Sequence, residues 1–441
     1  MLLVQYLKGA TGATAVVEGV QTAIRAGDLR GGDLLPSVRV LAKEIGLSPG
    51  TVAAAYRSLR ERSLAETLGR SGTIVRGSRM RPMRSVVPPV GGSVLDLSTG
   101  QPDPGLLPAF ADGFKAGTQL LRAADQMVLP ELLEIAQRRF AQDNVQDKFT
   151  TVANGGLDAI GRTLITQLRP GDIVGVEDPG WPNMLDQVAA LGLRVHPIPV
   201  DQDGPMPDGL AAALRAGARA VVVTNRAHNP TGAFLTAERA ACLRDVLRSH
   251  PDILTIEDDH AAELTKVPLA TIAGATSAWA FVRSMSKPYG PDLRLAFLAG
   301  DAATVNYVES HIRVTCGWVS TILQQLAVHL YTDSLATQAV ASAGAEYDRR
   351  RQLLLQRLNE LSIPALGATG LNVWIPVDDE TATTSALLQA GWAVAPGNRF
   401  RQHSAPGIRI TMAASDDTHI QHIAAVIHQS LSRSGAQSRT T

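Results

Sequence analysis

Residues 281–291 read FVRSMSKPYGP, an apolar run followed by a loop of small residues that carries one lysine, Lys287. A lysine that lies against an apolar sheet and near other cations can be deprotonated, and its neutral amine is then a nucleophile that forms a Schiff base with an aldehyde. A lone lysine in a loop is more often simply solvated. The interpretation therefore depends on the polar groups that the rest of the chain places beside this loop.

Short apolar runs alternate with amphipathic helical patterns from residue 95 onward. The runs lie at 173–177, 219–223, 253–257, 279–283 and 295–299. Buried strands interleaved with helices predict an α/β domain with a mainly parallel sheet that is covered on both faces. Ligands of such sheets bind at the carboxyl ends of the strands, so we expect the functional site there.

Three side chains near these strand ends suit different parts of one ligand. Asp258 follows the run at 253–257, and a carboxylate buried there can hold a protonated pyridine nitrogen. Asn229 stands in the turn NPTG, where its amide can donate to a phenolic oxygen. Trp181, in EDPGWPNM, offers a flat ring for stacking.

An anion site is predicted at 153–160, ANGGLDAI, where a helix begins directly after a strand. Backbone N–H groups at the start of a helix can bind a phosphate. The small serines of the lysine loop leave room for that phosphate, and the arginine seven residues after the lysine can reach it. The residues of this predicted phosphate site are Gly155, Gly156, Leu157, Ser284, Ser286 and Arg294.

Aldehyde, pyridine, phenol, phosphate and ring face together describe pyridoxal 5'-phosphate (PLP). Through the SxSK loop with its following arginine and the NPTG turn, residues 95–430 resemble the fold-type I PLP enzymes of the aminotransferase family. The resemblance implies that Lys287 forms the internal aldimine. It also implies that Arg409, in GIRITMA, pairs bidentately with a substrate α-carboxylate. We assign no metal site.

The amino-terminal part of the chain is basic and the remainder is acidic, although the whole chain is neutral. Residues 1–85 hold 13 Lys and Arg against six Asp and Glu, a net charge of +7, and the rest holds 28 against 35, a net charge of −7. A small basic module is the electrostatic footprint of a nucleic-acid binder. A solvated basic surface would give the same charge count, so the pattern of elements has to decide.

Helical spacing predicts a helix at 13–25, a short helix that opens at Pro36-Ser37, and a further helix that Ser48 caps. Two short helices across a tight turn form a helix-turn-helix, whose second helix enters the major groove. Two small strands at 64–68 and 73–75 then flank a glycine-rich tip, which indicates a wing.

These elements, with LPSxRxLA and TVxxAYxxL, resemble the GntR family of winged-helix regulators over residues 13–76. Pro49-Gly50 departs from the family, which usually has an arginine and a small polar residue there. We expect a DNA-binding domain at 1–77, a linker at 78–94 and an aminotransferase-like domain at 95–441. The DNA-contacting residues that the resemblance implies are Arg39, Ser48, Thr51, Tyr56, Arg70 and Gly72.

The combination of both domains resembles the MocR subfamily of GntR-type regulators. That resemblance implies a homodimer that binds a double-stranded DNA operator and senses PLP or an amino compound through an aldimine at Lys287. Within this subfamily, the regulators of vitamin B6 salvage, the PtsJ type, are our hypothesis for a neighbour of this chain. An amino acid or a taurine-like compound is the rival effector. A working aminotransferase with an appended DNA-binding module is the alternative function, and a PLP carrier is a third.

Four departures from the aminotransferase pattern favour sensing over turnover. His260 replaces a tyrosine that tunes the cofactor phenol, and the stretch RAADQMVLPE lacks the tyrosine that in the family reaches the partner subunit's phosphate. Leu157 stands in the phosphate loop, and Pro288 directly follows the lysine. None of the four removes the lysine or its aspartate.

The cysteine count and the hydropathy predict a soluble cytoplasmic protein. Cys242 and Cys316 are the two cysteines of the chain, so no disulfide framework is expected. No stretch reaches about 18 apolar residues, which argues against a membrane span.

Overall fold

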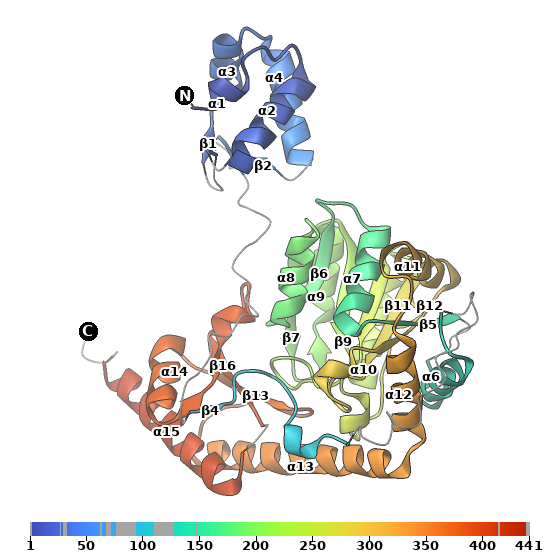
Figure 1. The fold of residues 1–441 in the computed structure, drawn as a ribbon. Helices are drawn as coiled ribbons and strands as arrows, with labels where there is room; N and C mark the ends of the chain where they lie inside the picture. The colour runs from blue at the N-terminus through green and yellow to red at the C-terminus, as the bar shows by residue number, and fades with distance from the viewer. Residues whose placement is uncertain are drawn as a thin grey trace. The chain divides into compact units, whose positions relative to one another are not determined.

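The computed structural model describes residues 2–26, 28–29, 33–61, 64–67, 72–75, 94–109, 127–145, 149–412 and 415–437. The chain divides into two compact units, one that contains residues 1–83 and one that contains most of the remainder. Figure 1 shows the fold coloured along the chain. The predicted linker at 78–94 lies, apart from its last residue, outside the described residues.

The amino-terminal module has four helices and a small sheet in its described part. Its helices are α1 (Leu2–Tyr6), α2 (Ala13–Ala26), α3 (Val38–Ile45) and α4 (Pro49–Glu61). Strands β1 (Leu34–Leu35), β3 (Thr73–Val75) and β2 (Ala65–Thr67) form an antiparallel sheet in that order. The predicted helix-turn-helix and wing strands are therefore present, and α1 and β1 are additions that the sequence patterns did not indicate.

Capping residues set the boundaries of the two central helices. Ser37 Oγ accepts a hydrogen bond from Val40 N at the start of α3, and Gly46, with φ of 70°, ends that helix in the left-handed conformation that glycine tolerates. Ser48 Oγ accepts from Thr51 N at 3.1 Å at the start of α4, as predicted. The apolar faces of α2, α3 and α4 meet in one core that includes Val20 and Leu59.

The second unit is built on a mixed sheet. In the described part of the chain its strand order is β5-β12-β11-β10-β9-β6-β7-β8. The strands are β5 (Phe149–Ala153), β6 (Ile173–Asp178), β7 (Arg194–Asp201), β8 (Gly204–Pro205), β9 (Ala218–Thr224), β10 (Leu254–Asp258), β11 (Ala278–Ser284) and β12 (Ala296–Gly300). Strands β6, β9, β10 and β11 pair in parallel, whereas β12 is antiparallel to both β11 and β5. All five predicted strands exist, but the run at 295–299 is not parallel.

Helices flank the large sheet and a smaller carboxyl-terminal sheet (Figure 1). They are α6 (Pro130–Gln142), α7 (Gly156–Gln167), α8 (Pro182–Ala190), α9 (Pro207–Arg215), α10 (Ala237–Leu247), α11 (Ala302–Thr315), α12 (Thr321–Thr332), α13 (Ser334–Glu360), α14 (Glu380–Gln389) and α15 (Asp417–Gln437). The smaller strands are β13 (Asn372–Pro376), β16 (Gly407–Thr411) and β15 (Ala395–Pro396), in the sheet order β13-β16-β15, and β14 (Trp392–Ala393), which pairs with β4 (Leu95–Asp96).

Two apolar cores hold this unit together. One packs the large sheet against α6, α12 and α13, and in it the ring of Phe140 meets those of Phe281 and Phe297 edge to face. The other packs β13 and β16 against α14 and α15. No helix in the described ranges is both long enough and apolar enough to span a lipid bilayer.

Candidate functional site

A pocket of about 260 Å³ lies at the carboxyl ends of the central parallel strands. The predicted cofactor and ligand residues that line it are Lys287, Asp258, Asn229, Trp181, Gly156, Leu157, His260, Ser284, Ser286, Arg294 and Arg409. The remaining predicted residue, Gly155, lies beside Arg294. Residues as far apart in the chain as Ser98 and Arg409, which are 311 positions apart, thus meet at one site.

Lys287 lies in the pocket, where its ammonium group donates hydrogen bonds to a backbone oxygen and to a side-chain amide oxygen. Its Nζ donates to the Gly100 carbonyl oxygen at 2.6 Å and to Gln101 Oε1 at 3.1 Å. Burial, together with the positive charges of Arg409 and Arg294, lowers the pKa of Lys287 to about 8, although Asp258 acts in the opposite direction. A lysine with this pKa is partly neutral near pH 7, as nucleophilic attack on an aldehyde requires.

Asp258 closes strand β10 and is buried at the base of the pocket. Its Oδ2 lies 3.2 Å from His260 Nδ1. The sequence led us to expect that His260 tunes a cofactor phenol, and this stays a prediction. In the structure its ring contacts the carboxylate of Asp258. The imidazole can therefore influence whatever group binds to that carboxylate.

The loop before α7 leaves no room for side chains. Gly155 has φ of 94°, and a Cβ on it would lie 2.7 Å from Arg294 Nη2. A Cβ on Gly156 would lie 3.2 Å from Ser284 Cβ. Arg294 itself donates to the Asn154 carbonyl oxygen at 3.1 Å. A helix start, an arginine and two serines thus surround a space that suits a phosphate.

Arg409 on β16 is a buried cation at the opposite side of the pocket. Its Nη1 donates to Asn229 Oδ1 at 2.9 Å, and its Nη2 donates to the Ser98 carbonyl oxygen. Its Nε is buried without a hydrogen-bond partner, and among the described residues no carboxylate forms an ion pair with it. Burial and the nearby Arg399 lower the pKa of Arg409, but a guanidinium remains charged near neutral pH. The arrangement suits an anionic ligand.

Both parts of the chain match known protein families. Residues 92–427 match the family "Aminotransferase class I and II", and residues 13–75 match "Bacterial regulatory proteins, gntR family". The vitamin B6 salvage pathway transcriptional repressor PtsJ of Salmonella typhimurium is 39% identical over 430 residues, which cover 96% of this chain and 99% of PtsJ. The chain belongs to the MocR-like regulators, in which a GntR domain precedes an aminotransferase domain.

Two further comparisons agree with this assignment. The pyridoxine biosynthesis transcriptional regulator PdxR of Corynebacterium glutamicum is 30% identical over 58% of this chain and 57% of PdxR. The structure of a kynurenine aminotransferase from Pyrococcus horikoshii matches with a TM-score of 0.70 at 20% identity, over 78% of this chain and 92% of that one. At this level of identity the structural match establishes the fold alone.

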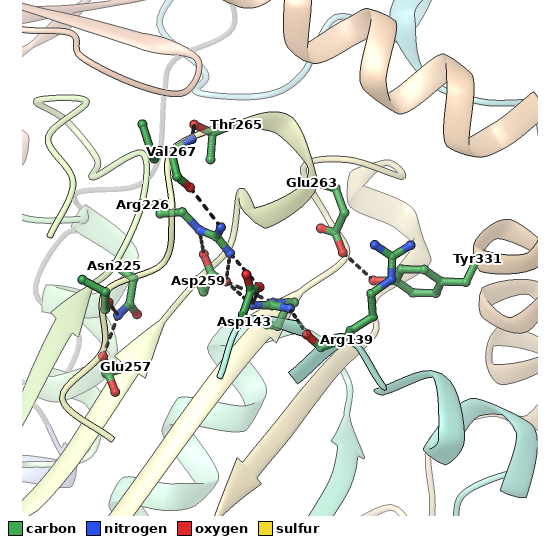
Figure 2. A network of polar contacts seen from close by, with 12 residues as sticks. Arg139, Asp143, Asn225, Arg226, Glu257, Asp259, Glu263, Thr265, Val267 and Tyr331 are labelled. Carbon is green, nitrogen blue, oxygen red and sulfur yellow. Dashed lines mark hydrogen bonds and ion pairs between the residues drawn. The ribbon is translucent and has the colours of Figure 1, made fainter. Parts of the chain in front are cut away.

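Next to pocket residues in the sequence lie Asp259 and Arg283, which form an arginine–aspartate cluster with Arg226 and Asp143 in this MocR-like regulator. Figure 2 labels Arg226, Asp259 and Asp143. Asp259 accepts hydrogen bonds from Arg226 at 2.8 and 2.6 Å and from Arg283 at 3.0 and 2.8 Å. Asp143 Oδ2 accepts from Arg283 at 2.6 Å. Burial alone would raise the pKa of Asp259, but the two guanidinium groups lower it overall. The cluster therefore joins the ends of β9, β10 and β11 directly behind the residues that line the pocket.

The sequence patterns missed this cluster and the segment 98–101, which forms one wall of the pocket. The charged residues of the cluster gave no signal that they pair inside the protein, because the partners are 24 to 140 positions apart. The segment STGQ carries no charge, so its proximity to Lys287 had no visible cause in the sequence.

The predicted DNA-contacting residues of the regulator differ in exposure. Arg39 on α3 is exposed, Ser48 and Thr51 lie at the start of α4, and Gly72 borders the wing with φ of 101°. Tyr56 is 2% exposed, and its hydroxyl donates to the Pro36 carbonyl oxygen at 2.7 Å. Its role is thus packing of α4 against the start of α3, because a side chain enclosed in the core does not reach DNA. Arg70 lies outside the described residues.

The acidic residues that flank Asp258 are bound by protein groups. Within the ranges that the structure describes, no group of three or more His, Cys, Asp or Glu is arranged to hold a metal ion. Glu257 and Asp259, which flank Asp258, are instead engaged by protein donors: Glu257 accepts from Asn225, Thr271 and Ile272.

Proposed function

We propose that this protein is a transcriptional regulator of vitamin B6 genes that binds operator DNA through its winged helix and binds PLP in the pocket around Lys287. The observation that carries the proposal is the 39% identity to PtsJ over nearly the whole of both chains, which includes the DNA-binding module as well as the PLP-type domain. The name of PdxR links a second relative to pyridoxine biosynthesis.

The pocket residues fit PLP. Gly155, Gly156 and Arg294 would hold the phosphate, since the glycine loop has room for oxygens where a Cβ would collide. Asp258 would hold the pyridine nitrogen, and Trp181 would cover the ring. When bound, PLP supplies an electrophilic aldehyde carbon, and Lys287 is the nucleophile of suitable pKa beside it.

Arg409 would bind an acidic group of an amino-compound effector. It is buried, it has an unpaired Nε, and its existing partners are neutral oxygens of Asn229 and Ser98. A carboxylate or sulfonate could therefore replace weak acceptors with a charge-assisted, bidentate pair. A ligand changes DNA binding only if it binds the DNA-binding conformation and the other conformation with different affinity. This requirement applies to PLP and to such an effector alike.

Arg39, Ser48 and Thr51 would contact the operator, and Arg39 would bind a phosphate of the DNA backbone. From the MocR-like family we also propose a homodimer, which would present two winged helices to two half-sites of the operator. We propose a cytoplasmic location as well. Sedimentation of the purified chain with and without PLP tests the dimer.

A working aminotransferase is the second candidate, and the pocket favours it in one respect. The lysine, the aspartate and the carboxylate-binding arginine of such an enzyme are all present at one site. The two functions separate in one experiment: amino-group transfer from a panel of amino acids to 2-oxo acids is measured beside DNA binding to the gene's own upstream region. Turnover at an enzymatic rate without specific, salt-sensitive DNA binding would favour the enzyme.

A further inference from the structure

The two hydrogen bonds of Lys287 Nζ come from neighbouring residues of one short segment. The Gly100 carbonyl oxygen lies 2.6 Å away and Gln101 Oε1 lies 3.1 Å away. Gly100 contributes a backbone group, so every substitution there retains the acceptor. Gln101 contributes a side chain that lies exposed at the pocket.

The segment is held in place on both sides of these acceptors. Before them, Thr411 N donates to the Leu97 carbonyl oxygen at 2.9 Å, and Gly100 N donates to Thr411 Oγ1 at 3.1 Å. After them, Asp103 N donates a hydrogen bond to the Tyr347 hydroxyl oxygen at 2.7 Å. Gly100 also has φ of 67°, and a Cβ on it would lie 2.8 Å from Arg409 Nη1. The backbone that carries both acceptors is therefore fixed beside Nζ.

Bond formation to an aldehyde removes the hydrogens that these acceptors use. The ammonium has three N–H donors, and it must first lose a proton. The lone pair of the neutral amine then attacks the aldehyde carbon, a C=N bond forms, and the carbonyl oxygen leaves as water with the two remaining N–H hydrogens. The resulting imine nitrogen carries at most one hydrogen, and only when it is protonated. It therefore cannot keep the hydrogen bonds to both Gly100 and Gln101, which are charge-assisted in the ammonium, and at least one of them is lost.

We propose that Gln101 is a positioning residue that competes with the aldehyde for Lys287 Nζ and thereby sets the PLP concentration at which the site fills. This inference rests on the proposed function, because it requires that Lys287 takes an aldehyde. For a regulator such competition is useful, since it keeps the site empty until the aldehyde exceeds a threshold.

The electrostatics make the competition measurable near neutral pH. Burial and the two arginines lower the pKa of Lys287 to about 8, so the protonated and neutral forms are both populated in this range. An acceptor that favours the ammonium raises this pKa, and its loss lowers it. Capture of the aldehyde then becomes faster or slower in proportion to the neutral fraction.

The test uses the full-length protein and follows the absorbance band that appears when PLP bonds covalently to lysine, as a function of pH. Gln101→Leu removes the acceptor and Gln101→Glu replaces it with a charged one. Gln356→Leu is the matched control, because Gln356 lies exposed on α13 and bonds to Glu360. At pH 7 we expect capture about fivefold faster in Gln101→Leu and about tenfold slower in Gln101→Glu, which corresponds to a shift of about one unit in the pH midpoint in each direction. The differences should shrink well above pH 9, where the amine is neutral in every variant.

The outcomes separate the two claims. If wild-type protein develops no band at any PLP concentration, the proposed function fails. If the band forms but both Gln101 variants follow the wild-type pH profile, or if both change in the same direction, Gln101 does not compete for Nζ and the inference is overturned. Opposite shifts of the midpoint, with an unchanged control, support it.

Discussion

Arg283 and Asp259 connect two neighbouring strands of the sheet directly behind the pocket. Arg283 donates from Nε and Nη2 to Asp259 Oδ2 at 3.0 and 2.8 Å, and each residue is one position away from a residue that lines the pocket, Ser284 or Asp258. Consecutive residues of a strand point to opposite faces. The ion pair therefore fixes from behind the two strand ends that present the lysine loop and the carboxylate.

Asp259→Asn should destabilise the protein strongly, because it leaves two buried guanidinium groups with one aspartate. Removal of one partner from a buried ion pair costs about 3–5 kcal/mol of unfolding free energy. Asp201→Asn is the matched control, since Asp201 pairs with Arg239 but its side chain is 40% exposed. We expect about 1 kcal/mol or less there. Chemical denaturation measures both, and equal losses in the two variants would contradict a special role for the cluster.

Tyr56→Phe should affect stability and leave DNA affinity unchanged. The change removes the hydroxyl that donates to the Pro36 carbonyl oxygen, which costs about 1 kcal/mol. Because Tyr56 is buried, the folded variant presents the same surface to DNA. A binding titration at a temperature where the variant is folded checks this, and a large loss of affinity would restore Tyr56 to the DNA interface.

Arg39→Ala should weaken binding to all DNA sequences and reduce its dependence on salt. Arg39 is exposed on α3, where a cation can neutralise one phosphate. Loss of one phosphate contact lowers the slope of log affinity against log salt by about one. Lys43→Ala on the same helix is the comparison. If the slope for Arg39→Ala equals that of the wild type, Arg39 makes no phosphate contact.

Arg409→Met should abolish the response to acidic amino compounds and retain PLP capture, although capture near pH 7 should be slower because the variant lacks a charge that lowers the pKa of Lys287. The variant loses the charge-assisted hydrogen bonds to an effector, a loss of about tenfold to hundredfold in effector affinity. Stability should change little, because the buried guanidinium has no carboxylate partner among the described residues and methionine fills a similar space. Calorimetric titration of the PLP-loaded protein with amino acids provides the measurement. Undiminished effector binding would show that the acidic group binds elsewhere.

The sequence predicted the elements that local patterns encode. The lysine loop after an apolar strand, Asp258 at a strand end and the Ser48 cap of α4 all follow from short stretches, and the structure has each of them. Strand direction was not encoded in this way. The run that became β12 looks like its neighbours in composition, and only its pairing with β11 and β5 makes it antiparallel.

The segment that holds Lys287 could not be found from the sequence for a physical reason. Gly100 and Lys287 are 187 positions apart, and a carbonyl oxygen is present at every residue, so nothing marks this one as a partner. Tyr56 shows the converse limit. Its pattern TVxxAYxxL suited both a DNA contact and a core position, and only the packing of α4 distinguishes the two.

The most direct test of the account is a PLP titration of the full-length protein and of Lys287→Ala, with binding to the gene's upstream DNA measured at each PLP concentration. We predict that PLP produces the covalent absorbance band in the wild type, that DNA affinity changes over the same concentration range, and that Lys287→Ala shows neither change. DNA affinity that responds identically to PLP in both proteins, or that never responds while the band forms, would contradict the claim that Lys287 couples PLP to DNA binding.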